Sequence, residues 1–448
     1  MSQAPWARTL LSRVAYDYGM VAVLALLCVY YSWVTLSLQY PDGASGGRQL
    51  AAQIAAAKTT GPVLIVVGDT PDDAVLADVL VERLHAAGHP ETMVVKGQQS
   101  DARKELEKSS AAGIRWEFVA CNQVTSGWPV FEGADKRFSC MTGAKVVSPG
   151  AYRWPNFLKT NNLLNIANQI AVIAIIAIGM TIVVISGGID LSVGSLIALS
   201  AVVTALIIRD FGGGAQASTM AMVGACAAGI ISCALLGLVS GAMITCFAIP
   251  PFIATLAMML VASGLAFILA HGQSIYQVPD SFIWLGRGAT AGVPNGVLLM
   301  VILYLLAHLL MTRTVLGRYL YAVGGNPEAA RLSAVPVRTV LLFAYALCAC
   351  FAGVGGIVMA SQLKSGAPTY GQMYELYVIA AVVVGGASLS GGEGQVLGTL
   401  VGALIIAVIQ NGMNLTNVES YTQKVVLGLV LLGAVLLDML KRRRLRRA

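Results

Sequence analysis

The stretch SGGIDLSVGS at residues 186–195 places a carboxylate, Asp190, among glycines and serines between two long apolar runs. Burying a charge in the centre of a bilayer is costly, so Asp190 is expected to face protein or a water-filled cavity. The glycines predict a break in one helix, and Asp190 suits the N-cap of a second helix beginning at Leu191. Two roles stay open for Asp190: a cap that fixes the bend, and a group that faces a polar path or its gate.

Five further polar side chains interrupt apolar segments, where they are rare. An amide, hydroxyl or carboxylate in such a place can hydrogen bond either a polar solute or a neighbouring helix. They are Asn168, Gln169, Thr255, Glu375 and Gln410. The residue types leave both roles open, so all five are candidates for a polar path.

Other chemistry finds no support in the motifs. The chain lacks HExxH and GxSxG, and it has no paired aspartates arranged for catalysis, so an enzyme acting within a membrane is not favoured. No cysteine and histidine spacing suggests a metal site. The chain also lacks GxGxxG and GxxxxGK[ST], so we expect no cofactor and no ATP site in it.

The elements that would position these side chains are membrane-spanning helices. Of the 448 residues, 57% are hydrophobic and only 11% are charged, and apolar windows of about 20 residues recur. Each such window must be a helix, because backbone groups in lipid have to be satisfied within the segment. Ten spans are predicted, at 18–38, 163–185, 191–208, 219–247, 251–270, 294–312, 337–360, 374–389, 395–410 and 421–438.

The charge distribution predicts the orientation of these spans. The net charge is +7, but the basic residues cluster at the chain ends and in one loop, which does not favour nucleic acid as a partner. Arg8 and Arg13 precede the first span, and KRRRLRR follows the last. The positive-inside rule then places both termini in the cytoplasm, together with the loop 313–336. The first span is expected to be a retained signal anchor, because no convincing cleavage site follows it.

A hydrophilic segment separates the first two spans and predicts a soluble α/β domain outside the cytoplasm. Short apolar runs at 63–70, 92–97 and 116–122 alternate with amphipathic runs at 72–89 and 101–113. This is the pattern of a small parallel sheet, and a helix at 46–58 would cover its other face. We therefore predict four segments. They are 1–40 with the first span, the insert 41–155, a membrane core 156–440 and a basic tail 441–448.

Two cysteines, Cys121 and Cys140, lie in this insert, which the topology places in an oxidising compartment. A disulfide between them stays open, because sequence does not supply the Cα separation that a disulfide requires. The run ending in FVACN, together with the strand and helix order, resembles one lobe of the periplasmic sugar-binding proteins. A single lobe has no complete cleft, so we expect a docking or regulatory module.

The membrane core resembles a known family. TNNLLNIANQ (160–169), GGIDLSVGS (187–195), LGRYLYAVGGNPEAARLSAVPV (316–337) and GGASLSGGEGQVLGTLVGALI (385–405) are similar to the permease subunit of bacterial ABC importers of the ribose, xylose and galactose type. The resemblance runs from about Phe157 to Asp438. It implies an all-α polytopic protein of the bacterial inner membrane that forms the passage for a monosaccharide or a similar small polar solute. The insert departs from the family pattern.

The resemblance also implies three protein partners: a cytoplasmic ATP-binding cassette ATPase, a periplasmic sugar-binding protein, and a second permease subunit, identical or paralogous. It gives the loop 313–336 the role of contacting the ATPase. The coupling residues are then Gly324, Gly325, Asn326, Pro327, Glu328, Ala329, Ala330 and Arg331. Asn326 suits an N-cap and Pro327 the first helical position, so a helix PEAARLSA is predicted to run until Pro336 stops it. Ala334 stands where relatives usually carry glycine.

The alternative from another class is a membrane-anchored sugar sensor, in which the insert would detect a ligand. Signalling normally needs a cytoplasmic output domain, and only a short basic run follows the last predicted span. Co-purification with an ATPase would separate the two hypotheses.

Overall fold

The structure, a computed structural model, describes residues 5–57 and 59–445. The chain divides into two compact units. Residues 36–155 form the α/β unit, and the segments on either side of it form the helical unit. Residues 446–448 of the predicted basic tail, residues 1–4 and the last residue of the predicted helix 46–58 lie outside the described residues.

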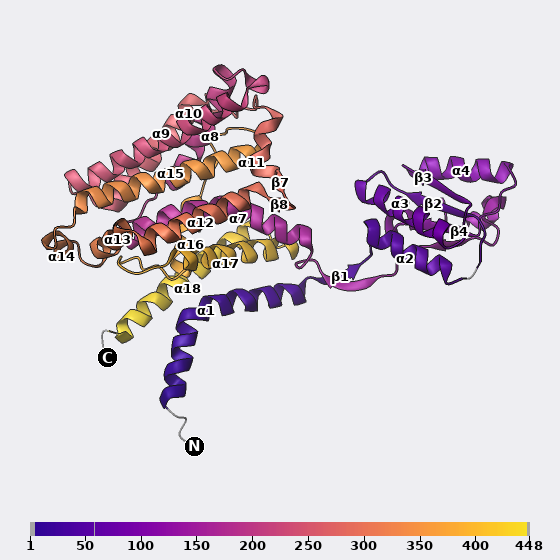
Figure 1. The fold of residues 1–448 in the computed structure, drawn as a ribbon, viewed down its shortest axis with the longest axis horizontal. Coiled ribbons are helices and arrows are strands. Elements are labelled where there is room, and N and C mark those ends of the chain that lie inside the picture. Colours follow the sequence, from indigo (N-terminus) through magenta and orange to yellow (C-terminus); the bar gives the residue numbers. More distant parts are fainter. Residues whose placement is uncertain (1–4, 58, 446–448) are drawn as a thin grey trace. The chain divides into compact units, whose positions relative to one another are not determined.

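The helical unit contains a helix at each of the ten predicted positions (Figure 1). Seven described helices are long and apolar enough to cross a membrane: α7 (Thr160–Ile185), α8 (Val193–Asp210), α9 (Thr219–Cys246), α10 (Pro251–Leu269), α12 (Asn295–Arg313), α15 (Val337–Leu363) and α17 (Val396–Leu415). The other three have shorter apolar segments and are α1 (Pro5–Val34), α16 (Tyr374–Val384) and α18 (Ser420–Leu445). The chain is therefore a polytopic helical membrane protein with an added α/β unit.

Helix α7 forms the centre of the bundle. Its apolar window is 89% buried, against 28% for α9 and α10, because residues 170–185 are apolar on every face of the helix. Gly179 lets α15 approach closely, since a Cβ at this position would lie 2.7 Å from the Cα of Cys348. The helices α9, α10 and α12 instead expose apolar side chains on their outer faces.

Helix α1 packs against the last part of the core. The ring of Tyr31 lies directly over Gly412 of α17, where any side chain would overlap it, and it stacks on Phe157 with centroids 6.2 Å apart. The Tyr31 hydroxyl lies 3.5 Å from the carbonyl oxygen of Ile409. α1 and α17, which are far apart in the sequence, thus meet in one contact.

Two short helices and two short strands occupy the ends of the bundle. At one end lie α13 (Val315–Gly325) and α14 (Pro327–Leu332), and at the other lies the hairpin of β7 (Ala289–Thr290) and β8 (Val293–Pro294) (Figure 1). The short α11 (Trp284–Arg287) precedes the hairpin. α13 and α14 are separated by the single residue Asn326.

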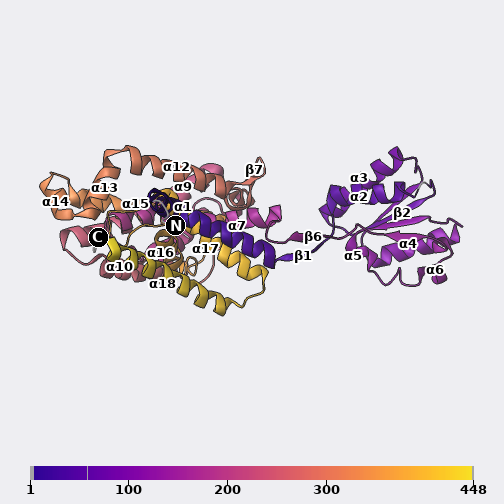
Figure 2. The same ribbon diagram turned by 90° about the horizontal axis from the view of Figure 1, so that it is seen from below.

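The α/β unit is a four-stranded parallel sheet in the order β3-β2-β4-β5. The strands are β2 (Val63–Val67), β3 (Thr92–Lys96), β4 (Phe118–Cys121) and β5 (Lys145–Val147). α2 (Gly43–Ala55) and α3 (Pro71–Ala86) cover one face and α4 (Gln99–Ala111) the other (Figure 2). The central β2 is buried throughout, which explains its uninterrupted apolar run. The predicted parallel sheet is confirmed.

Several short elements complete this unit. The helices α5 (Gln123–Ser126) and α6 (Ala134–Arg137) follow β4. β1 (Leu36–Gln39) and β6 (Tyr152–Pro155) pair as an antiparallel ribbon, with Leu36 opposite Pro155, at the two ends of the unit's chain. The sequence did not predict β1, β5 or β6.

The cysteines of the α/β unit are not bonded to each other. Cys121 and Cys140 are both buried free thiols, so the disulfide left open by the sequence is absent. The Cys140 thiol is 3.3 Å from the Leu106 carbonyl oxygen, to which it donates. Burial raises the pKa of Cys121 to about 12, so this thiol stays protonated and unreactive.

Candidate functional site

Two helices of the bundle begin inside it rather than at an end. After α7 ends at Ile185 the chain turns back, and Asp190 lies beside Cys348 of α15. Cys348 packs on Gly179, which is about 9 Å along α7 from its last residue. α8 then starts at Val193. α16 starts at Tyr374, and a Cβ on Gly194 of α8 would lie 2.6 Å from the oxygen of Gly371. The starts of α8 and α16 therefore meet within the core.

Asp190 stabilises the first of these starts, though not as the predicted N-cap at Leu191. Its Oδ1 accepts hydrogen bonds from the Ser192 backbone N–H (2.9 Å) and hydroxyl (2.6 Å), and the helix begins two residues later than expected. The side chain is fully buried, and the Cys348 thiol lies within hydrogen-bonding reach of its carboxylate. Asp190 thus belongs to the packed core and lines none of the pockets described below.

A polar pocket of about 200 Å³ lies beside the first turn of α16. We call it the amide pocket, because three glutamines from three helices line it: Gln169 of α7, Gln362 of α15 and Gln410 of α17. Tyr374 and Tyr377 of α16 complete its polar lining, with their rings edge to face at 6.2 Å. Amides both donate and accept hydrogen bonds, so this pocket suits a neutral solute with many hydroxyl groups.

A second pocket of about 290 Å³, with both apolar and polar side chains in its lining, lies on another side of the same turn. We call it the carboxylate pocket, because Glu375 lines it together with the side chains of Ser195, Ser263, Tyr370 and Gln372. The Glu375 carboxylate is so close to Gly194 at the start of α8 that a side chain there would overlap it. The positive end of the α8 dipole favours a carboxylate at this position.

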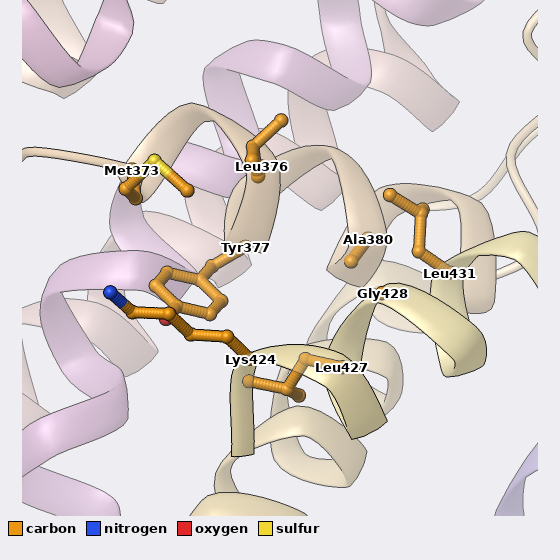
Figure 3. Close-up of a pocket in the computed structure, with 8 residues that line it drawn as sticks. All are labelled: Met373, Leu376, Tyr377, Ala380, Lys424, Leu427, Gly428 and Leu431. Carbon is orange, nitrogen blue, oxygen red and sulfur yellow. The ribbon is translucent and has the colours of Figure 1, made fainter. Parts of the chain in front are cut away.

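A third, apolar groove lies between α16 and α18 (Figure 3). Leu376, Ala380, Leu427 and Leu431 supply apolar walls, and the Lys424 side chain extends past the Tyr377 ring toward Met373. Such a surface offers few partners for solute hydroxyls. The first turn of α16 therefore separates the amide and carboxylate pockets from an apolar groove, with Tyr377 shared between the amide pocket and the groove.

The structure separates the six predicted path residues into two groups. Gln169, Gln410 and Glu375 line the polar pockets. The other three bond to their own chain. The Asn168 amide donates to the oxygen of Gly286 (3.3 Å), and the Thr255 hydroxyl donates to the oxygens of Pro251 (2.9 Å) and Ile189 (3.3 Å). Asp190 accepts hydrogen bonds from Ser192, the N-cap residue of α8, as described.

Three residues of the amide pocket were missed by the sequence reasoning: Gln362, Tyr374 and Tyr377. Gln362 lies just beyond the predicted end of its span at 360, whereas α15 continues to Leu363. A tyrosine does not stand out in an apolar run, although its hydroxyl needs a partner when buried. The YELY pattern at 374–377, with two tyrosines about one turn apart beside a glutamate, was the available signal.

The helix predicted in the loop 313–336 is present as α14, and it is shorter than expected. Asn326 is its N-cap and accepts a hydrogen bond from the Ala329 N–H (3.0 Å), with Pro327 and Glu328 in the first turn. The helix ends at Leu332 rather than continuing toward Pro336, because Ala334 adopts a left-handed conformation (φ +63°). The N–H of Val335 then bonds back to the oxygen of Ala330 (3.0 Å).

The exposed face of α14 differs from the predicted one at a single position. Ala330 is only 5% exposed and packs against its own chain, so it cannot be part of a contact surface for another protein. Pro327, Glu328, Ala329 and Arg331 are exposed, and Leu332 is 89% exposed. Leu332 was not singled out in the sequence, and it is the most exposed large apolar side chain of α14.

A bundle of apolar helices with polar pockets where two of them begin defines the chain as a polytopic transport protein. Residues 162–435 match the family described as "Branched-chain amino acid transport system / permease component". The match covers more than half of the chain, and the chain belongs to this family. The α/β unit lies outside the matched residues.

Curated relatives agree with the family. The chain is 43% identical over 288 residues to the ribose import permease protein RbsC of Escherichia coli (strain K12), covering 63% of this chain and 87% of the relative. It is 37% identical to the L-arabinose transport system permease protein AraH of the same organism, over 64% of this chain and 86% of the relative. It is 38% identical to the probable ABC transporter permease protein y4mJ of Sinorhizobium fredii, over 65% and 83%. No solved structure matches the chain.

The chain is thus the permease component of an ABC transporter, and a separate subunit hydrolyses the ATP. This assignment replaces the alternative of a membrane-anchored sensor.

Proposed function

We propose that this permease carries a monosaccharide and that the amide and carboxylate pockets form part of its path. The observation that carries the proposal is the convergence of Gln169, Gln362 and Gln410 with two tyrosines on one pocket of about 200 Å³. Sugar hydroxyls need partners that both donate and accept, and amides provide them. The relatives RbsC and AraH are named for ribose and L-arabinose.

The same pocket argues against an amino acid as the solute, despite the wording of the family description. A zwitterion taken out of water needs an opposite charge for each of its own charges. The amide pocket has no charged side chain in its lining. Glu375 in the carboxylate pocket offers a single negative charge and no positive one accompanies it there.

The proposal includes the orientation of the permease in the membrane and its protein partners. The basic residues near both chain ends support a bacterial inner-membrane protein with both termini in the cytoplasm. With that orientation α14 lies on the cytoplasmic side, where it would contact the ATPase, and the α/β unit lies outside, where a periplasmic sugar-binding protein delivers the solute. A second permease subunit would complete the path, and the α/β unit would act as a docking or regulatory module.

The test is uptake of radiolabelled ribose and arabinose into vesicles that contain the permease, its ATPase and its binding protein. Gln410→Leu removes one hydrogen-bonding group from the path. If the solute loses about 1.4 kcal/mol of interaction in the rate-limiting step of transport, the transport rate falls about tenfold. We expect uptake to fall by this factor, with ATPase association unchanged.

The matched control is Gln216→Leu, which makes the same change in an exposed turn after α8. It should leave uptake as in the wild type. Equal uptake by the Gln410 variant and the wild type would remove the amide pocket from the path.

A further inference from the structure

Three segments of the helical unit contact one another through their backbones, with no side chain between them. They contain Gly187 after α7, Gly324 at the end of α13, and Gly391 and Gly392 between α16 and α17. A Cβ on Gly391 would lie 2.6 Å from the oxygen of Gly324 and 2.8 Å from the Cα of Gly187. We call this contact of backbones the glycine junction.

A hydrogen bond fixes the centre of the glycine junction. Ile185 is the last residue of α7, so its carbonyl oxygen has no partner within the helix. The Gly392 N–H donates to this oxygen over 2.8 Å. The end of α7 is thus bonded to the turn before α17.

Gly324 packs against the same carbonyl group from the side of α13. A side chain at Gly324 would overlap the Ile185 oxygen, and its Cβ would lie 2.7 Å from the Gly392 nitrogen. The neighbouring Gly325 has no heavy atom within 4 Å of its Cβ position. Neither residue has a positive φ. An added Cβ at Gly324 would therefore clash with backbone atoms, whereas an added Cβ at Gly325 would meet open space.

A second bond attaches α13 to the same turn. The Tyr321 hydroxyl, about one turn before Gly324, donates to the oxygen of Gly394 over 2.7 Å. α13 thus contacts residues 391–394 at two positions one helical turn apart, Tyr321 and Gly324. Because only Asn326 separates α13 from α14, a displacement of α14 would be passed to this contact.

Each of the other two turns leads to a polar pocket. From Ile185 the chain continues through Asp190 to the start of α8, where Gly194 touches Glu375 of the carboxylate pocket. From residue 394 it continues into α17, which carries Gln410 of the amide pocket. The glycine junction therefore connects the exposed α14 with the helices that line both pockets.

We infer that Gly324 is a positioning residue that transmits the movement of α14 to the helix starts around the solute path. The inference rests on the proposed roles of α14 and of the two pockets. Spatial continuity alone does not establish coupling, so the decisive quantity is solute moved per ATP hydrolysed.

The experiment compares Gly324→Ala with Gly224→Ala in vesicles containing the ATPase, the binding protein and radiolabelled ribose. Gly224 is an exposed glycine of α9 at which an added Cβ also meets no heavy atom within 4 Å. Because Leu332 and Ala329 stay exposed in both, we expect the ATPase to co-purify with either variant and ATP hydrolysis to continue. Gly324→Ala should lower the ribose moved per ATP at least tenfold, and Gly224→Ala should stay within twofold of the wild type. An unchanged ratio for Gly324→Ala would overturn the inference and leave the proposed function standing.

Tyr321→Phe keeps the test decisive if Gly324→Ala does not accumulate in the membrane. It removes one hydroxyl and adds no atom, and we expect a threefold or greater fall in ribose moved per ATP. A wild-type ratio in Tyr321→Phe, with Gly324→Ala either normal or absent from the membrane, would also overturn the inference. If the wild-type chain neither binds an ATPase nor takes up sugar, the proposed function itself fails.

Discussion

Ala334 has a left-handed backbone conformation immediately after α14, at a φ of +63°. This region costs an L-residue about 1 to 2 kcal/mol because its Cβ approaches the following carbonyl oxygen, and glycine avoids that cost. The position closes the C-terminus of α14, where the Ala334 N–H bonds to the oxygen of Arg331 over 3.1 Å. The local strain explains why glycine is the residue expected here.

Replacing Ala334 with glycine should therefore stabilise α14. We expect slower hydrogen exchange of the amides of Ala330 and Ser333, which bond within this turn. Ala329→Gly is the control, because glycine inside an exposed helix costs about 1 kcal/mol relative to alanine and should accelerate the same amides. Faster exchange in the Ala334 variant would contradict the assigned conformation.

Single residues also show how far the sequence could predict the site. Gln169, Gln410 and Glu375 were predicted as path residues because polar groups are rare in apolar spans, and all three line pockets. Asn168 and Thr255 satisfied the same rule, but Asn168 bonds to Gly286 of α11, and Thr255 bonds to Pro251 of its own helix and to Ile189 in the turn before α8. The residue type shows that a polar side chain needs a hydrogen-bond partner, but the fold determines whether that partner is a neighbouring backbone group or a group in a pocket.

At the scale of the element, the exposed side of α14 makes a prediction about the ATPase. Burial of a leucine side chain at an interface contributes about 1.5 to 3 kcal/mol. Leu332→Gln should therefore weaken ATPase association by about tenfold to a hundredfold, measured by co-purification at graded ATPase concentrations, without loss of permease from the membrane.

Two variants control this experiment. Leu363→Gln changes an equally apolar, half-exposed leucine at the far end of α15, and it should leave ATPase association unchanged. Ala330→Glu should instead destabilise the permease, because it forces a charge into the packed side of α14. Normal ATPase binding by Leu332→Gln would exclude this side chain from the interface.

The elements that sequence predicted well are those with a strong period or a long apolar run. β2, β3 and β4 were predicted, since each is an apolar run followed by an amphipathic helix or turn. β5, at three residues, is too short to show a pattern. α16 was expected to reach 389 but ends at Val384, because Gly385 packs on Thr399 of α17 and Gly386 turns the chain with a φ of +83°. A contact between residues so far apart in the sequence cannot be predicted from the local sequence.

At the scale of the whole molecule, the α/β unit joins the helical unit at two adjacent points. The Asn156 N–H donates to the oxygen of Thr35 over 3.0 Å, and the Phe157 N–H donates to the Thr35 hydroxyl over 3.1 Å. The residues on both sides of the inserted chain are therefore hydrogen bonded to each other within the helical unit.

Replacing residues 36–155 with a short Gly/Ser linker should consequently leave the helical unit intact. We expect the shortened chain to accumulate in the membrane and to bind its ATPase as the full chain does, because the core helices pack without the α/β unit. The measurement is the amount of permease in washed membranes and the fraction of ATPase that co-purifies. Loss of either would make the α/β unit part of the membrane fold.

The contact between α1 and α17 can form only late during synthesis of the chain. Tyr31 and Ile409 are 378 residues apart, and at a synthesis rate of about 5 to 20 residues per second this interval takes roughly 20 to 75 s. During that period α1 is complete while the surface that covers Tyr31, including Gly412, has not yet been made. α1 thus waits in the membrane for α17, and the contact between them forms only after the residues in between have been made.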